Sequence, residues 1–116
     1  MLEAKSFTKP DETREFGHGK LEIVKIGEGT VGKSTFEPRW KWSTDVKPIV
    51  GTDSCEVNHF GYVISGRMKV VLNDGSEAEA GPGDVINIPG GHDAWVVGDE
   101  ACVIVDWAGN ATYAKR

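Results

Sequence analysis

The sequence predicts an all-β fold built as a jelly roll or barrel, and three observations support this class. Short apolar runs bounded by turn residues recur at spacings of roughly 8 to 12 residues. The 15 glycines are scattered along the 116 residues, as expected where turns join many short strands. No segment has a convincing 3.6-residue periodicity of apolar positions, which a helix would need. A chain of this length is expected to form one domain with a single core.

We expect residues 1–19 to form an N-terminal arm or irregular edge segment, because mixed charges surround Pro10. The barrel is expected over residues 20–109, followed by a C-terminal tail at residues 110–116. Residues 44–54 are expected to be a loop, and Asn73-Asp74-Gly75 is a strong hairpin turn. The expected strands are residues 21–26, 30–37, 57–65, 67–72, 76–80, 85–88, 94–97 and 101–107.

The formal net charge of −5 argues against a nucleic-acid partner, which would require a basic stripe. No apolar run approaches the roughly 20 residues that cross a bilayer, so no membrane association is expected. The polar start of the chain lacks the apolar core of a signal peptide, and the expected location is the cytoplasm. Two cysteines, Cys55 and Cys102, are too few for a disulfide scaffold and are expected to be thiols there.

One string of residues suggests a different class of protein. Residues 27–34, Gly-Glu-Gly-Thr-Val-Gly-Lys-Ser, fit the Walker A pattern and follow a plausible strand. Phosphate binding by this motif requires a helix that starts at Lys33, so that its N-terminal amides face the phosphates. Pro38 would break such a helix within two turns. We therefore expect a hairpin with an exposed Lys33 and no nucleotide cofactor.

The most informative segment is residues 81–92, Gly-Pro-Gly-Asp-Val-Ile-Asn-Ile-Pro-Gly-Gly-His. It combines a tight turn, a short buried strand and a second turn that ends in an imidazole. This segment resembles the second conserved motif of the cupin superfamily, a glycine, five residues and then Pro-x-Gly, which Gly83, Pro89 and Gly91 match. The resemblance covers residues from about 30 to 107 and implies a cupin-type double-stranded β-helix, which is a jelly-roll barrel.

The histidine of this segment departs from the family pattern. The family usually places its metal-binding histidine three residues after the last glycine, where this chain has Ala94. The imidazole stands two residues earlier, at His92. Side chains two apart on a strand point the same way and are displaced by about 7 Å. We therefore expect that His92 can enter the same cavity at a different depth.

The first cupin motif usually ends in a glutamate, six residues and a glycine. With Gly66 as that glycine, His59 takes the place of the glutamate, and imidazole and carboxylate both bind divalent metals. The upstream His-x-His pair falls either on Asp45 and Lys47 or on Asp53 and Cys55, depending on the spacing. Under either alignment both histidines are lost. Lys47 would pair with a substrate carboxylate instead of binding a metal.

The resulting hypothesis is a metal site of His59, His92 and Cys55, with Asp45 as a further candidate ligand and open positions for water or substrate. The mixed donor set suits zinc, iron, nickel or manganese. The alternatives are that His59 and His92 only line a ligand pocket and that Cys55 is a small buried hydrophobe. Other assignments are that Cys102 is core, that His18 is solvated, that Trp107 closes the core, and that Trp40, Trp42 and Trp95 either line the cavity with Lys47 or fill the barrel.

Three functions are compatible with this pattern. The first is a cupin that binds a small molecule, with or without a metal, in its cavity. The second is a metal-dependent enzyme, either an oxygenase or an isomerase, that acts on a small carbonyl or carboxylate compound. The third is a non-catalytic structural or sensory barrel that acts through its surface. The resemblance also implies a homodimer. Fold alone does not choose among these functions.

Overall fold

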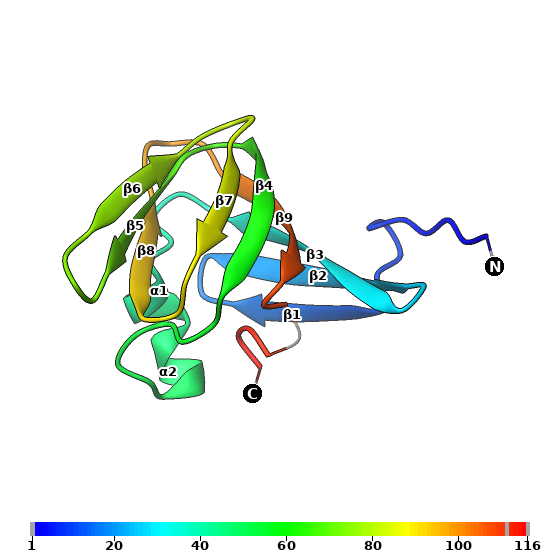
Figure 1. Cartoon of the computed structure of the whole chain (residues 1–116), viewed down its shortest axis with the longest axis horizontal. Coiled ribbons are helices and arrows are strands. Elements are labelled where there is room, and N and C mark those ends of the chain that lie inside the picture. The colour runs from blue at the N-terminus through cyan, green and yellow to red at the C-terminus, as the bar shows by residue number, and fades with distance from the viewer. Residues whose placement is uncertain (1, 111, 116) are drawn as a thin grey trace.

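The computed structural model describes residues 2–110 and 112–115, which fold into two antiparallel β-sheets that enclose a common core (Figure 1). The larger sheet has the strand order β1-β2-β3-β9-β4-β7, and the smaller one has the order β6-β5-β8. The strands are β1 (Glu12–Phe16), β2 (Gly19–Ile26), β3 (Gly29–Phe36), β4 (His59–Ser65), β5 (Met68–Leu72), β6 (Glu77–Ala80), β7 (Val85–Ile88), β8 (His92–Val96) and β9 (Cys102–Ala108). This all-β jelly-roll barrel confirms the predicted fold class.

The turns form where the glycine pattern predicts them. Gly83, before β7, and Gly91, after it, have φ angles of +90° and +89°, which an L side chain adopts only with strain. The two turns make β7 a short strand that pairs with β4 and lead the chain directly into His92 at the start of β8. The backbone of the segment 81–92 is therefore shaped by its glycines.

The core lies between the two sheets, because alternate side chains of each strand point inward. On β9, for example, Cys102, Ile104 and Asp106 are buried, whereas Val103 and Val105 are only partly covered. The buried apolar positions of the two sheets include Leu21, Ile23, Val63, Ile104, Met68, Val70, Ala94 and Val96. Asp106 is a charged side chain at a core position, which marks it as unusual.

The structure differs from the sequence expectation at the N-terminus and in the loop after β3. Glu12–Phe16, inside the expected arm, is a regular edge strand that pairs with β2 along its whole length. The segment expected as a loop contains two single-turn helices, α1 (Trp42–Asp45) and α2 (Lys47–Val50), with Pro48 in the first turn of α2. Four-residue helices are too short to give a periodicity that a sequence could reveal.

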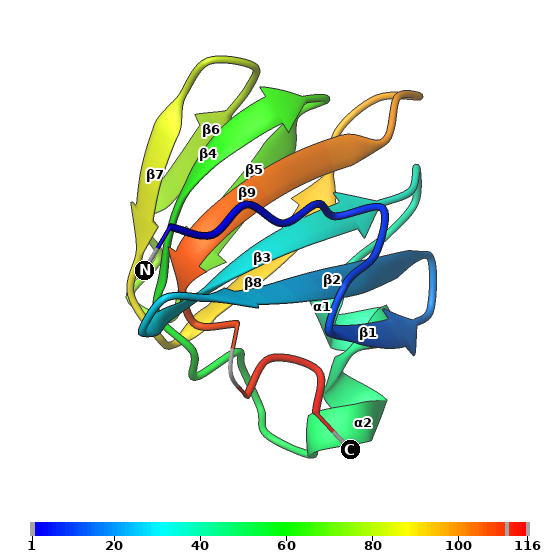
Figure 2. The ribbon, with the colours of Figure 1, turned by 90° about the vertical axis from the view of Figure 1, so that its right-hand side faces the viewer.

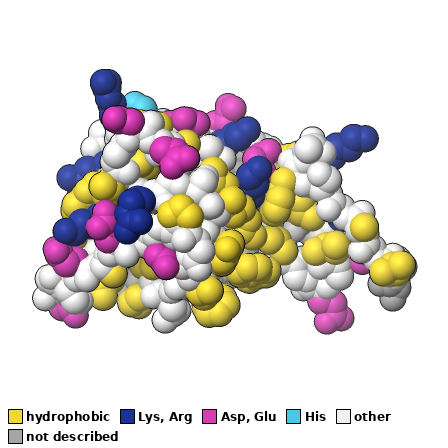
Figure 3. Space-filling model, turned by 90° about the horizontal axis from the view of Figure 1, so that it is seen from above, with side chains coloured by type: hydrophobic (Ala, Val, Ile, Leu, Met, Phe, Trp, Pro, Cys, Tyr) yellow, Lys and Arg dark blue, Asp and Glu magenta, His cyan; other side chains and the backbone are white. Residues whose placement is uncertain are grey.

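Trp107 does not close the core as expected. Its side chain is 53% exposed on the outer face of β9, because Asp106 takes the inward position beside it. It lies near Phe60 of β4, with ring centroids 6.5 Å apart. Figure 3 shows a group of exposed hydrophobic side chains near the middle of the face seen from above, and Tyr62 and Ile64 of β4 are also exposed. The homodimer stays a prediction, for which this outer face would offer apolar surface.

The two ends of the chain differ in how they pack against the barrel. The first residues run away from the barrel along the β2–β3 hairpin (Figures 1 and 2), where Lys5 pairs with Asp11 at 2.7 Å. The C-terminal tail instead folds back, and Tyr113 and Ala114 are buried. Nη1 of Arg14 on β1 donates to the carbonyl oxygens of Asn110 and Tyr113, at 2.8 Å each. The tail is therefore tied to the larger sheet.

Neither of the helices in residues 2–110 and 112–115 has the length or the apolar character that crossing a bilayer requires.

Candidate functional site

Three segments bring Cys55, His59 and His92 together. Cys55 lies in the connection before β4, His59 begins β4 and His92 begins β8. An isolated bridge joins Cys55 to His92, with the Cys55 N–H donating to the His92 carbonyl oxygen at 2.8 Å. The turn at Pro89-Gly90-Gly91 closes the arrangement, because the Gly91 N–H donates to the Cys55 carbonyl at 2.7 Å.

The side chains of these three residues converge on one point. The candidate ligand atoms, one from each residue, all lie within 4.8 Å of one another. The Cys55 sulfur is 3.8 Å from Nε2 of His59, and the two imidazole centroids are 5.5 Å apart. His92 and Ala94 are both buried on the same face of β8. The parity argument from the sequence is therefore confirmed, and His92 enters the barrel.

An oxygen atom lies on the Nδ1 side of each imidazole ring, at hydrogen-bond distance only for His92. Nδ1 of His92 is 2.8 Å from the Pro89 carbonyl oxygen, which can only accept, so Nδ1 carries the proton and Nε2 keeps its lone pair. Nδ1 of His59 is 3.9 Å from Oδ2 of Asp106, while its Nε2 faces Cys55. Nδ2 of Asn110 donates to Oδ1 of Asp106 at 3.0 Å. Each imidazole therefore has an oxygen acceptor on its Nδ1 side.

Burial sets the charge of the cluster. It raises the pKa of the Cys55 thiol to about 11. Burial, with the nearby His92 as a smaller cause, lowers the pKa of His59 to about 4, and burial also lowers the pKa of His92. Burial raises the pKa of Asp106 to about 6, although the Asn110 hydrogen bond opposes this. Near neutral pH the cluster thus offers two neutral imidazoles and a thiol.

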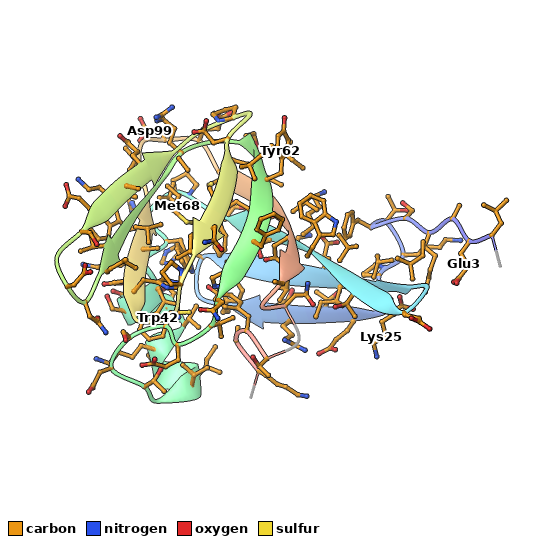
Figure 4. The ribbon with its side chains drawn as sticks, viewed as in Figure 1. Glu3, Lys25, Trp42, Tyr62, Met68 and Asp99 are labelled. Atoms are coloured by element: carbon orange, nitrogen blue, oxygen red, sulfur yellow. The ribbon has the colours of Figure 1, made fainter. Side chains whose placement is uncertain are left out.

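A cavity of about 40 Å³ lies beside this cluster, with room for about three water-sized groups. Its lining is mainly apolar and includes Trp42 of α1 and Met68 of β5, which are labelled in Figure 4. The polar side chains that line it are Ser34, His59, His92 and Asp106, together with Trp40 and Tyr113. Nε1 of Trp40 and the hydroxyl of Tyr113 are buried and have no hydrogen-bond partner within residues 2–110 and 112–115.

The structure brings only part of the expected site together. Trp40 and Trp42 line the cavity, whereas Trp95 is partly covered on the other face of β8, with Nζ of Lys41 5.2 Å from its ring centroid. Asp45 lies outside the cluster, since its carboxylate accepts from the Lys41 N–H at 3.0 Å and contacts Nδ1 of His18 at 3.0 Å. Lys47 begins α2 and is not among the described residues that line the cavity, and Asp53 is exposed.

Sequence reasoning missed Asp106 and Tyr113. Asp106 could have been found, because it shares the inward parity of Cys102 and Ile104 on a strand that is otherwise apolar there. Tyr113 gave no signal, since it lies in a short tail without pattern. Its ring packs edge-on against His59, with centroids 5.3 Å apart. The tail thus supplies a wall of the cavity.

The Walker A string forms the β2–β3 hairpin. Its turn lies at Gly27, with a φ of +57°, and Lys33 and Ser34 belong to β3. Lys33 pairs with Glu22 and Val105 of the neighbouring strands. The backbone at Lys33 is therefore extended where phosphate binding requires the start of a helix.

Comparisons with known proteins agree with this geometry. Residues 52–108 match a family model described as Cupin domain. No curated protein has a sequence that matches this chain. The polyketide cyclase RemF from Streptomyces resistomycificus is similar in fold, with a TM-score of 0.65 and 23% identity over 93% of this chain and 79% of that one.

Two other solved structures are similar. A protein of unknown function from Rhizobium leguminosarum bv. viciae 3841 has a TM-score of 0.59 and 22% identity over 79% of this chain and 81% of that one. KdgF from Halomonas sp. has a TM-score of 0.54 and 22% identity over 79% of each chain. Identities this low establish the fold alone. The family match identifies a cupin domain over residues 52–108, and the similar structures share its fold.

Proposed function

We propose that this cupin binds a divalent transition metal, preferentially zinc, through Cys55, His59 and His92, and that a small molecule binds beside it. The convergence of these three side chains on one point carries the proposal. A thiolate and two imidazoles are donors that zinc prefers, whereas manganese favours oxygen ligands. Three protein ligands leave a further position for water or a small molecule, as in zinc sites that remain open.

The spacing of two of the three donors fits the proposed metal. Zinc–sulfur bonds of about 2.3 Å and zinc–nitrogen bonds of about 2.0 Å at a tetrahedral angle place the two donor atoms about 3.5 Å apart. The Cys55 sulfur and Nε2 of His59 are 3.8 Å apart. The two atoms therefore need only a small adjustment to share one ion.

The acceptors on the far side of the two histidine rings also support a metal site. Imidazoles that bind a metal usually donate their second N–H to a carbonyl or carboxylate, which fixes the tautomer. The Pro89 carbonyl stands in that position behind His92, and the Asp106 carboxylate stands on the corresponding side of His59. A bound zinc ion would supply a Lewis acid at the open position. The residues around it would hold the ligand and exclude bulk water.

Metal analysis of the purified protein tests this proposal. We expect about one zinc ion per chain after incubation with zinc and removal of the excess, and loss of that zinc in His59→Ala. His18→Ala is the matched control, because His18 is a half-exposed histidine that pairs with Asp45 away from the cluster. A wild-type protein that takes up no metal, or a His59→Ala variant that keeps its zinc, would contradict the proposal.

A further inference from the structure

A second, larger depression lies next to the cavity. It is a groove of about 430 Å³ lined by residues of β5, β6 and β7. β6 and β7 are edge strands of different sheets, so the groove runs along the seam where the barrel is not closed by strand pairing. Its volume falls in the range of small-molecule sites, and apolar side chains such as Val70, Leu72 and Ala80 cover much of it.

The groove and the cavity share a wall. Ile86 and Ile88 of β7 line both of them. These two side chains point to the same face of β7, since they are two residues apart, and both are only partly buried. Ile86 and Ile88 therefore form a wall that the groove and the cavity have in common.

Two buried donors define what the cavity can recognise. The Trp40 indole N–H can only donate, and the Tyr113 hydroxyl can donate or accept. Both side chains line the cavity, and neither atom has a partner among the described residues. Leaving a buried donor unpaired is unfavourable, so an acceptor that reaches it gains binding free energy. The complementary group on a ligand is an oxygen atom that accepts hydrogen bonds.

The charges that line the groove disfavour anionic ligands. The residues that line the groove include Glu77, Glu79 and Asp84, and within residues 2–110 and 112–115 no lysine or arginine lines the groove or the cavity. Lys69 and Arg67 pair with Glu77 and Glu79 at 2.9 and 3.6 Å, and these pairs reduce the free positive charge near the rim. Because these two cations are already paired, an anionic ligand would find no unpaired lining cation among the described residues to compensate its charge.

We infer that the groove and the cavity form one site for a small neutral organic molecule with an apolar body and an accepting carbonyl or hydroxyl oxygen. The apolar body occupies the groove, and the oxygen passes Ile86 and Ile88 to reach Trp40 and Tyr113. This inference deepens the proposed function, on which its link to the metal site rests. The two donors, however, belong to the protein itself, so the site can be tested without a metal.

Nuclear magnetic resonance of the metal-free protein tests the inference with cyclohexanone as the probe. The Trp40 indole resonance is assigned by its loss in Trp40→Phe. We expect it to move downfield and saturate as cyclohexanone is added. Methylenecyclohexane, which has the same shape without the oxygen, and the anion cyclohexanecarboxylate should each bind about tenfold more weakly or worse. Tyr113→Phe, which removes only the hydroxyl, should weaken cyclohexanone binding about tenfold.

Two matched variants test whether the ligand passes Ile86 and Ile88 on its way from the groove to the cavity. Ile86→Phe enlarges the shared wall and should suppress the Trp40 response. Ile64→Phe makes the same change on the outer face of β4, where Ile64 is 48% exposed, and should leave the response intact. An unmoved Trp40 resonance, equal binding of the hydrocarbon, or tighter binding of the carboxylate would overturn the inference. Zinc content is measured separately, so zinc binding without a cyclohexanone response would refute this inference and leave the proposed function standing.

Discussion

The surroundings of Cys55 and Cys102 differ although the two thiols are equally buried. Cys55 is 2% exposed and Cys102 is 0% exposed, and burial raises the pKa of each to about 11. Cys102 begins β9 opposite Phe36, within the apolar core. Cys55 instead lies 3.8 Å from His59 and is bridged to His92. Burial keeps both thiols protonated, and the neighbouring imidazoles alone make one of them a candidate ligand.

The largest expected effect that separates the two cysteines is the pH dependence of zinc affinity. Zinc binding at Cys55 must displace the thiol proton, because the pKa of that thiol is about 11. The pKa of His59 is about 4 and that of His92 is also lowered, so neither imidazole releases a proton above about pH 6.5. Affinity should therefore rise about tenfold per pH unit, or about 100-fold between pH 6.5 and 8.5.

Zinc titrations against a competing chelator at several pH values measure this slope. Cys102→Ser should keep the slope of the wild type. Cys55→Ser should lose it together with most of the affinity, because the hydroxyl replaces the sulfur that zinc prefers. A wild-type affinity that is flat between pH 6.5 and 8.5 would mean that the thiol of Cys55 does not bind the metal.

The next effect concerns the carboxylate behind His59. Asp106→Asn should lower zinc affinity about tenfold, at the low end of the range for groups that orient metal-binding histidines. Asp45→Asn is the control, because Asp45 is also a buried carboxylate beside a histidine, but its partner His18 lies outside the cluster. Equal loss of affinity in both variants would show that buried charge in general, and not the position of Asp106, supports the site.

The smallest effect on zinc binding is expected from a substitution of Cys102. Cys102→Ser places a hydroxyl in the apolar core and should lower the free energy of unfolding by about 1–3 kcal/mol. Zinc content per folded chain should be unchanged, since the candidate ligand group consists of Cys55, His59 and His92 and does not include Cys102. Denaturant unfolding and metal analysis of the same preparation check both statements. Loss of zinc in the folded variant would contradict the prediction that Cys55, and not Cys102, binds the metal.

Much of the fold could be predicted from the sequence because turn chemistry is local. Asn73-Asp74-Gly75 forms the expected turn between β5 and β6, and the strand β7 (Val85–Ile88) has the predicted bounds. The same reasoning correctly assigned the Walker A string to a hairpin. The short helices α1 and α2 could not be predicted, since their conformation depends on contacts such as the burial of Trp42 against the barrel.

The candidate site could be predicted only where the cupin motifs and strand parity indicate it. The first motif points to His59 and, under one of two spacings, to Cys55, and the second motif ends at His92, which strand parity directs into the cavity. Asp45 and Lys47 follow from the other spacing of the first motif, and the short helices place them away from the cluster. Tyr113 depends on how the C-terminal tail folds back, which Arg14 stabilises from the far end of the chain. Such long-range contacts leave no local pattern.

The most direct test of the metal site is the absorption spectrum of the protein loaded with cobalt(II) in place of zinc. A cobalt–thiolate bond gives a strong near-ultraviolet charge-transfer band that imidazole and carboxylate ligands do not give. We expect this band in the wild type and in Cys102→Ser, and its absence in Cys55→Ser. A band that persists in Cys55→Ser, or a wild type without the band, would contradict a metal site built on Cys55, His59 and His92.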